Sequence, residues 1–554
     1  MKFKNIFKIS IAVIFCMIAL VGCNKGKENK DKIVEEDKNH LQVLLDSDPK
    51  TLDQSKTVDT YSSQVLTNVM EGLTRIEVDE NGEDIIKPAG AEKWSVSDDG
   101  LVWTFKLRDM KWSDGQPVKV EDYIYGITRT LSPRVNSPYA FLLYPIKNAE
   151  DFNLGQVSER ELGVKKIDES TLQITLEVPT AYFLNLTYFK VMEPQRQDVV
   201  EKYGELYGSG SQYMVYTGPF IISSWTHDDE IQLLKNKNYW DEKSVKLEKI
   251  TMKVVQDEEK KMNELLNGDL DIANVYDKIT IEKLNDSNSF NIKKGYDGSV
   301  NYTIFNQQDK YFKNNKIRKA FIIAAAREEA CEDDFKNLAE PALGWCPPGV
   351  QLGSEEYRTN VNYFPVNNLK EEYSNPKQLL IEGLKELGLD PDPKKHTFKY
   401  LQSEINEKSK YYSELEKSVF EKKLGINIDI EYVGWVEFQQ KTRAMDYQMA
   451  AQSWIGDYND PSTFFDIWSS TAGIIQTGWS NEKYDRLIRE ASRTNNQKSR
   501  MELFNEAEKI LVEEDSVISP CLWKIRNIYV RKEIKNFTRP MWGTIDFKYT
   551  YIEQ

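Results

Sequence analysis

The chain has 554 residues, more than one ordinary domain holds, so the sequence predicts two or three folded parts. Hydrophobic residues make up 40% and aromatic residues 12% of the chain, which supplies buried cores and argues against a disordered protein. The formal net charge of −15 argues against a surface that binds nucleic acid or anionic membranes.

The first residues have the pattern of a targeting segment. A basic start precedes an apolar run over 9–20, which is too short for a comfortable membrane span. Leu20-Val21-Gly22-Cys23 then resembles the bacterial lipobox, in which the peptide is cut before a cysteine that carries a diacylglyceryl group. Since two acyl chains make a stable anchor, we expect a signal peptide over 1–22 and a lipid on Cys23. A plain signal peptide with a chance cysteine is the alternative.

The next stretch is a tether, because 24–38 is rich in Lys, Glu, Asn and Asp and nearly lacks apolar residues. Cys23 and residues 39 and 40 are counted with this stretch, so the expected tether covers 23–40. The protein is therefore expected outside the cytoplasm, lipid-anchored to the outer face of the cell membrane or on its periplasmic side.

Several elements follow from local patterns. Strands are expected at 41–45, at 94–96 and 101–108 as a hairpin around Asp98-Asp99-Gly100, at 172–176 and at 301–306. Helices are expected at 57–70, 317–327, 484–491 and 501–512, where apolar residues recur at helical spacing.

The stretch 447–461 carries the most chemistry. Its β-forming and small residues predict a buried strand that stops at Gly456, and Asp460-Pro461 then begins a helix with Asp as N-cap. Asp457 is thereby left at the carboxyl end of a strand, where open α/β sheets hold ligands. The alternative is that Asp457 merely caps or pairs locally.

The remaining cysteines leave two alternatives open. Cys331 and Cys346 can close a loop of about 15 residues, a disulfide worth roughly 3 kcal/mol in the chain-entropy model. An oxidising compartment permits that bond. Three free buried thiols, Cys521 included, are the other interpretation.

Signals of catalysis or metal binding are weak. The three histidines, His40, His227 and His396, lie far apart, and none has a companion at metal-ligand spacing. Gly208-Ser209-Gly210-Ser211 lacks the Lys and the strand–helix context of a phosphate-binding loop. Carboxylates are plentiful, but a solvated surface explains them better than a glycosidase pair. We expect no enzyme, no metal and no cofactor.

One block identifies a family. Trp103-Thr104-Phe105-Lys106-Leu107-Arg108 followed by Trp112-Ser113-Asp114-Gly115 resembles the signature of bacterial extracellular solute-binding proteins of the oligopeptide- and dipeptide-binding type. Further pieces agree in order and spacing over essentially the whole mature chain, and the resemblance is closest to the oligopeptide branch. Lys119 departs from the pattern, since the family usually has a capping Thr there.

The resemblance implies an α/β fold of the type II periplasmic-binding-protein class, with two hinged lobes and an additional inserted domain. The implied ranges are 41–80 with 207–300 and 520–554 for lobe 1, 81–206 for the inserted domain, and 301–519 for lobe 2. It implies a receptor of an ABC importer, most simply a monomer, that holds short peptides extended between the lobes. It would hand them to the permease subunits, which work with cytoplasmic ATPases.

The resemblance also assigns roles to particular residues. The Asp of the family's Asp-Tyr-Asn-(Asp/Glu)-Pro motif pairs with the peptide α-ammonium, and at that position this chain has Asp457. Backbone groups of Trp454, Ile455 and Gly456 would lie beside it. Trp435 and Tyr139 match pocket-lining aromatics, with plain core packing as the alternative for each. Relatives with a disulfide between the positions of Gly298 and Ile455 exist, but this chain has neither cysteine.

Other functions remain as alternatives. The same fold can bind a nickel chelate, haem or an oligosaccharide, although the isolated histidines disfavour metal and the aromatic residues allow a sugar. An extracellular glycan hydrolase is a third hypothesis, and the sensing of signalling peptides would need no different residues.

Overall fold

The computed structural model describes residues 39–80, 82–332, 336–353, 355–403 and 407–553. The signal peptide, the lipobox with Cys23, and the tether up to residue 38 therefore lie outside the described residues. The chain divides into two units, Met1–Lys38 and Asn39–Gln554, and the second contains every described helix and strand. Among these helices none combines the length and apolarity needed to cross a membrane.

The largest sheet has eleven strands and mixes parallel with antiparallel pairs. Its strands, in spatial order, are β17 (Asn427–Val433), β16 (Thr397–Ser403), β18 (Met449–Ile455), β12 (Phe290–Phe305), β19 (Ile518–Arg531), β11 (Ile272–Asn274), β1 (His40–Leu45), β10 (Lys249–Val254), β9 (Glu230–Lys235) and β8 (Phe220–Thr226), with β13 (Ala339–Pro341) paired to β19. A separate antiparallel sheet contains β4 (Ala91–Val96), β5 (Val102–Leu107), β7 (Thr171–Thr175) and β6 (Val164–Asp168).

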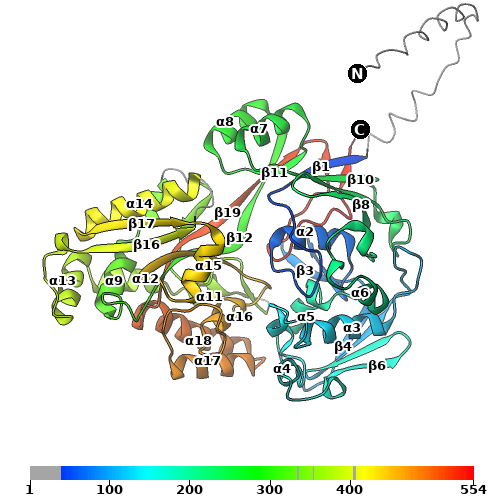
Figure 1. Cartoon of the computed structure of the whole chain (residues 1–554), viewed down its shortest axis with the longest axis horizontal. Helices are drawn as coiled ribbons and strands as arrows, with labels where there is room; N and C mark the ends of the chain where they lie inside the picture. Colours follow the sequence, from blue (N-terminus) through cyan, green and yellow to red (C-terminus); the bar gives the residue numbers. More distant parts are fainter. Residues whose placement is uncertain (1–38, 81, 333–335, 354, 404–406, 554) are drawn as a thin grey trace, which may run out of the picture. The chain divides into compact units, whose positions relative to one another are not determined.

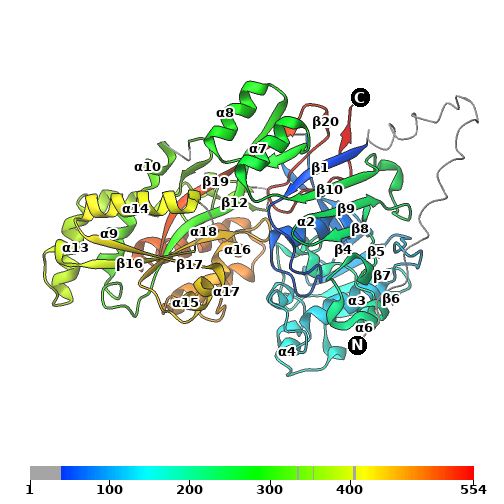
Figure 2. The ribbon, with the colours of Figure 1, turned by 45° about the horizontal axis from the view of Figure 1, so that its top comes forward.

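Two long strands connect the two halves of the large sheet. β12 and β19 pair antiparallel along most of their length, and Figures 1 and 2 both show them side by side. β18 pairs with β12 on one side, whereas β11 pairs with β19 on the other. Any change in the angle between the two halves therefore acts on these two strands.

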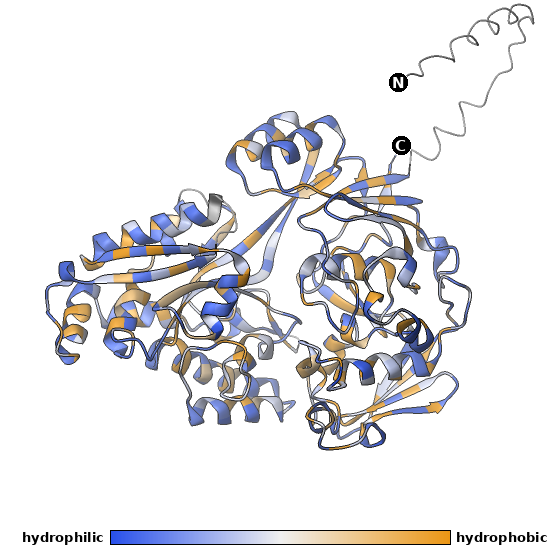
Figure 3. Ribbon diagram, viewed as in Figure 1, coloured by the Kyte–Doolittle hydropathy of each residue, from blue (hydrophilic) through white to orange (hydrophobic). Residues whose placement is uncertain are grey.

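Helices cover the strands and carry the site. They include α2 (Thr60–Val69), α3 (Val120–Leu131), α7 (Glu258–Asn267), α8 (Lys278–Ser287), α9 (Asn315–Ala324), α10 (Arg327–Glu332), α12 (Pro365–Glu372), α13 (Pro376–Glu386), α14 (Glu407–Leu424), α15 (Trp435–Arg443), α16 (Ser462–Phe465), α17 (Glu482–Ser492) and α18 (Gln497–Glu508). Figure 3 shows hydrophobic residues gathered on the strands and on the helix faces packed against them, with hydrophilic residues along the outer turns.

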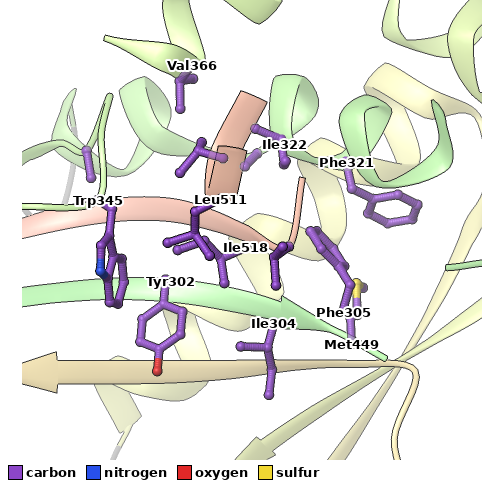
Figure 4. Packing of buried hydrophobic residues seen from close by; sticks show 14 of the residues in the cluster. Tyr302, Ile304, Phe305, Phe321, Ile322, Trp345, Val366, Met449, Leu511 and Ile518 are labelled. Atoms are coloured by element: carbon purple, nitrogen blue, oxygen red, sulfur yellow. The ribbon is translucent and has the colours of Figure 1, made fainter. Parts of the chain in front are cut away.

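Three large apolar clusters form the cores. One draws on residues 73–192 with Tyr458, a second on 41–70, 199–272 and 528–547 with Trp112, and a third mainly on 300–518. In the third, the ring of Tyr302 on β12 packs against Trp345 at 4.7 Å, and Phe305 packs against Phe321 of α9 at 6.4 Å (Figure 4). Several residues pack outside the part expected for them: Leu73 and Tyr458 pack with the first cluster, and Trp112, Val199 and Val200 pack with the second. Trp523 and Trp542, from the last segment, pack with the third. The domain division itself stays a prediction.

Most expected elements are confirmed within a few residues. The 94–108 hairpin is β4 and β5, the first strand is β1, and the two late helices are α17 and α18. The strand expected at 301–306 is the end of the much longer β12. The first helix begins only at Thr60, because the Asp59 carboxylate accepts the Ser62 N–H at 2.7 Å and caps it there.

The helix expected over 317–327 is interrupted. α9 ends at Ala324 and α10 begins at Arg327. The fully buried Arg327 guanidinium donates to the carbonyl of Ile322 in the last turn of α9, and also to the carbonyl of Pro520. A charged side chain that satisfies free carbonyls at the end of a helix stabilises the break.

The disulfide between Cys331 and Cys346 is not formed. Both residues and Cys521 are free thiols. Cys346 is buried in the third cluster, whereas Cys331 packs in a small separate cluster with Cys521. The short loop between Cys331 and Cys346 does not bring them together, because each packs with a different apolar cluster.

Candidate ligand-binding cavity

β18 ends where the sequence predicts, immediately before Gly456. The Gly456 N–H donates to the carbonyl of Gly298 at 3.1 Å. A Cβ at Gly456 would come within 2.4 Å of the Trp542 ring and 2.9 Å of Phe464, so only glycine fits this close approach. The chain turns here, and Asp457 follows at the carboxyl end of the strand.

The Asp457 carboxylate is half-buried and lies between two segments that are far apart in sequence. The Tyr139 hydroxyl donates to its Oδ1 at 3.3 Å, and the Asp457 N–H donates to Thr463 Oγ1 at 2.9 Å. Burial raises the pKa of Asp457 to about 6, although the charge of Lys190 and the Tyr139 hydroxyl oppose that rise. A carboxylate that is short of solvation favours a cationic partner.

Lys190 is the main residue that the sequence analysis missed. It is 5% exposed, its Nζ donates to Ser63 Oγ at 2.6 Å, and it lies over the Tyr139 ring at 5.0 Å. Burial lowers its pKa to about 8, against the raising effect of Asp457 and Asp59. The protein therefore places a cation of its own beside Asp457. A lysine inside the apolar run 188–192 was the signal that could have found it.

The helix after Asp457 begins differently from the prediction. α16 starts at Ser462, and the Asp460 carboxylate is committed elsewhere, to a bidentate pair with Arg500 at 2.7 and 2.8 Å. It still accepts the Ser462 N–H at 3.0 Å, but Pro461 already has helical torsion angles and is the N-cap residue. Both partners of the ion pair are buried, so this turn is held firmly beside Asp457.

A cavity of about 1070 Å³ opens in front of this turn. All six residues that the sequence analysis proposed as ligand-binding line it, namely Tyr139, Trp435, Trp454, Ile455, Gly456 and Asp457. Its walls also include parts of β1, α2, β19 and α15, so segments from both halves of the large sheet contribute. The volume is at the upper end for small-ligand pockets.

The aromatic residues are placed differently from one another. Trp435 begins α15, is 49% exposed and stacks on Phe438 at 5.7 Å, so about half of its surface is free to contact a guest. Trp454 is half-buried and its Nε1 donates to the carbonyl of Thr463 at 3.0 Å. Ile455 is 46% exposed. Core packing does not account for Trp435 or Ile455.

The loop after β18 also meets the segment expected to form the inserted domain. The rings of Tyr458 and Tyr182 stack at 4.7 Å, and Asn185 Nδ2 donates to the carbonyl of Asn459 at 3.2 Å. Together with the bond from Tyr139 to Asp457, these contacts join the loop to that segment. Sequence spacing alone did not predict this junction.

The described residues contain no group of three or more His, Cys, Asp or Glu side chains that could hold a metal ion. The histidines have separate local partners, with Thr251 at 2.8 Å from His40 and Asp48 at 2.7 Å from His227.

Comparison with known proteins identifies the family. Residues 86–476 match the model of bacterial extracellular solute-binding proteins, family 5. The chain belongs to this family. It is 32% identical over 543 residues to the dipeptide-binding protein DppE of Bacillus subtilis, covering 96% of each chain.

Solved structures of similar proteins agree. The substrate-binding domain of an oligopeptide ABC transporter from Bacillus anthracis matches with a TM-score of 0.80 at 30% identity, over 93% of this chain and 99% of that one. OppA of Listeria monocytogenes bound to peptide matches with a TM-score of 0.80 at 29% identity and the same coverage. The resemblance read from the sequence is thus confirmed, and the fold is that of type II periplasmic binding proteins. The family consists of extracytoplasmic solute-binding proteins and not of enzymes.

Proposed function

We propose that this family 5 protein is the substrate-binding component of an ABC importer and captures short peptides, extended, in the 1070 Å³ cavity. The observation that carries the proposal is the half-buried Asp457 at the wall of that cavity. Every linear peptide has an α-ammonium, and burying it without a partner is costly. Asp457 supplies the partner.

The edge of β18 supports the extended conformation of the guest. Its neighbour β16 pairs with it only at Met449 and Ala450, whereas β12 pairs with it as far as Ile455. Within the described part of the chain, residues 451–455 thus have no strand partner on the β16 side. Main-chain hydrogen bonds to such an edge give affinity that does not depend on the guest's side chains.

The assignment of individual residues is part of this proposal. Asp457 binds the ammonium, Trp454, Ile455 and Gly456 offer backbone groups, and Trp435 and Tyr139 contact side chains of the guest. Waters in a cavity of this size would fill the space that a given peptide leaves. Such a site accepts many peptides, because it binds what they share.

The membrane arrangement is likewise proposed. The lipobox resemblance at Cys23 supports a diacylglyceryl anchor, with residues 23–40 as tether except that His40 already belongs to β1. The other proposed partners are the permease subunits of the importer, and we propose that the protein binds them as a monomer. Globomycin treatment of producing cells should leave the precursor uncut, visible as a shift on a gel, if Cys23 is lipidated.

Of the other ligands considered, none has a supporting observation here. A nickel chelate, haem or oligosaccharide would use the same cavity, and the relatives named above are peptide-binding proteins.

Mass spectrometry of the gently purified protein tests the function. Native spectra should show heterogeneous added masses, and denaturation should release short peptides that can be sequenced. Release of one sugar, a haem or a metal chelate in stoichiometric amount would overturn the proposal.

A further inference from the structure

The ring of Trp542 packs against the turn that carries Asp457. Trp542 is 1% exposed, and although it follows β19 in sequence it belongs to the third apolar cluster. A Cβ at Gly456 would come within 2.4 Å of this ring, and a Cβ at Gly298 within 3.2 Å. The Gly456 N–H donates to the carbonyl of Gly298 at 3.1 Å, so one ring packs on β18 and β12 where they meet. The indole therefore supports the backbone immediately before Asp457.

A carboxylate holds the backbone of Trp542. β2 (Thr74–Val78) and β3 (Asp84–Pro88) form an antiparallel hairpin, and Asp84 is the first residue of its second strand. The two oxygens of Asp84 accept the N–H groups of Met541 and Trp542 at 3.1 and 2.9 Å. A carboxylate that accepts two adjacent backbone N–H groups makes stronger bonds than a neutral acceptor, so it fixes both residues.

The carbonyl before these residues is also held by side chains. Arg526, on β19, donates to the carbonyl of Pro540 at 2.7 Å, and Arg539 donates to the same oxygen at 3.1 Å. Both arginines line the cavity, and Asp84 acts electrostatically on each of them. The backbone that leads into Trp542 is therefore bound by charged side chains at its carbonyl as well as at its N–H groups.

The segment that follows is tied to α2. Asn68, on that helix, donates to the carbonyl of Ile545 at 2.8 Å and accepts the N–H of Phe547 at 2.9 Å. The same helix carries Ser63, which accepts from Lys190 at the wall of the cavity. The segment therefore connects the wall that holds this lysine with the turn that carries the site carboxylate.

The indole N–H of Trp542 has no acceptor among the described residues, although the side chain is 1% exposed. A buried donor that lacks a partner costs about 1–3 kcal/mol. Phenylalanine would avoid this cost, but it would fill less of the space against Gly456. The size of the ring, and not a hydrogen bond of its side chain, is therefore what Trp542 contributes here.

We propose that Trp542, held by Asp84, positions the Asp457 carboxylate for the ammonium of the guest. The inference rests on the proposed function, because it concerns the residue to which that ammonium is proposed to bind. A binding group has to be held within about 0.5 Å of its productive position by the residues behind it. A smaller ring would leave space against Gly456, and the turn would relax into that space. Trp542 is thus a positioning residue, since it acts on the guest through Asp457.

Two probes isolate the contribution of the ammonium. They are tri-alanine and propionyl-Ala-Ala, which is the same molecule without its α-ammonium group. Titration calorimetry on protein stripped of co-purified material by mild denaturation and refolding gives the ratio of the two affinities. Because a charge-assisted hydrogen bond contributes about 1.5–3 kcal/mol, the unchanged protein should prefer tri-alanine by about 10- to 100-fold.

Trp542→Phe should reduce this ratio by about 3- to 10-fold, while the affinity for propionyl-Ala-Ala changes by less than about twofold. A role in folding alone would weaken both probes together and leave the ratio unchanged. Trp523→Phe is the matched control, because Trp523 is buried in the same apolar cluster and its indole N–H also lacks a described acceptor. Its ring lies beside Arg358 at 5.7 Å, so the control should keep the full ratio.

Asp84→Asn tests the hold on Trp542 and covers the case in which Trp542→Phe does not fold. It keeps the shape of the side chain but leaves one oxygen where two N–H groups now bind, so the ratio should fall by about threefold. Asp297→Asn is its control, because Asp297 acts on the same two arginines but accepts from Ser299. The control removes an equal charge and should leave the ratio within about twofold.

Several results would overturn the positioning role and leave peptide binding intact. These are a ratio that neither Trp542→Phe nor Asp84→Asn changes, an equal fall in the matching control, or an equal weakening of both probes. Equal binding of the two probes by the unchanged protein would overturn the ammonium role of Asp457, and this inference with it. Failure of both probes to bind the unchanged protein would overturn the peptide-binding function itself.

Discussion

The two charged regions of the cavity differ in how their charges are compensated. At one, Asp457 has Tyr139 in hydrogen-bonding contact and the buried cation Lys190 close by. At the other, Arg526 and Arg539 share a backbone oxygen, and no described carboxylate lies within 4.0 Å of either. At neither region does an opposite charge of the protein lie within ion-pair distance among the described residues, but Lys190 acts electrostatically on Asp457, and Asp84 and Asp297 act in the same way on the two arginines.

The Asp457 region shows that a carboxylate can serve to bind a cationic guest even though a cation of the protein already acts on it. Lys190 opposes the rise in the pKa of Asp457 and so helps to keep the carboxylate ionised in the empty protein. The cost is that an arriving ammonium meets a like charge nearby. The affinity for a free-amine peptide thus depends on two opposing effects of Lys190, which keeps Asp457 ionised but repels the arriving ammonium. The following changes alter one effect or the other.

The largest effect is expected from Asp457→Asn, which removes the carboxylate and keeps the shape. A charge-assisted hydrogen bond contributes about 1.5–3 kcal/mol, so peptides with a free N-terminus should bind about 10- to 100-fold more weakly by calorimetry. N-acetylated peptides should bind weakly to both proteins and show no further loss. If acetylated and free peptides bind the unchanged protein equally, the ammonium role of Asp457 is wrong.

Acidification should produce a graded version of the same loss. The pKa of Asp457 in the empty protein is about 6, and pairing with an ammonium lowers it, so the bound form holds fewer protons. Affinity should be constant from pH 7 to about 6.5 and fall by up to about tenfold per pH unit below 6. Titrations from pH 5 to 7 measure this slope, and Asp457→Asn should flatten it. A slope that persists in the variant would assign the titration to another group.

Removing the positive charge of Lys190 should increase the affinity for peptides with a free N-terminus. Lys190→Met keeps an apolar stem of similar length, and without the repulsion free-amine peptides should bind about 3- to 10-fold more tightly at pH 7.5. Acetylated peptides should change little. Weaker binding of both kinds would mean instead that Lys190 positions the site through its bond to Ser63.

The smallest change in peptide affinity is expected at Trp435, an uncharged residue of the cavity wall. Trp435→Ala removes a ring that is 49% exposed in the empty protein, so it should cost only about 3- to 10-fold. The loss should be equal for free and acetylated peptides, because the ring does not distinguish their charges. A loss confined to peptides with aromatic side chains would assign Trp435 to a pocket of the protein that receives one such side chain.

Much of the local structure could be predicted from the sequence. The 94–108 hairpin, the strand that stops before Gly456 and the late helices follow from alternation, turn residues and helical periodicity. Where predictions were wrong, a distant partner was the reason. Arg327, for example, binds carbonyls of Ile322 and Pro520 and ends a helix early.

The sequence by itself determined the family, the strand end that carries Asp457, and the residue types at the wall of the site, because these depend on short-range pattern and on motifs. Only the tertiary structure decided which charges face one another. Lys190 lies over the ring of Tyr139 and Asp457 accepts from its hydroxyl, although the three residues are far apart in sequence, and Arg526 and Arg539 meet at the carbonyl of Pro540. Burial then shifts the pKa values of these groups, since the solvent around each is set by the packed chain and not by its neighbours in sequence.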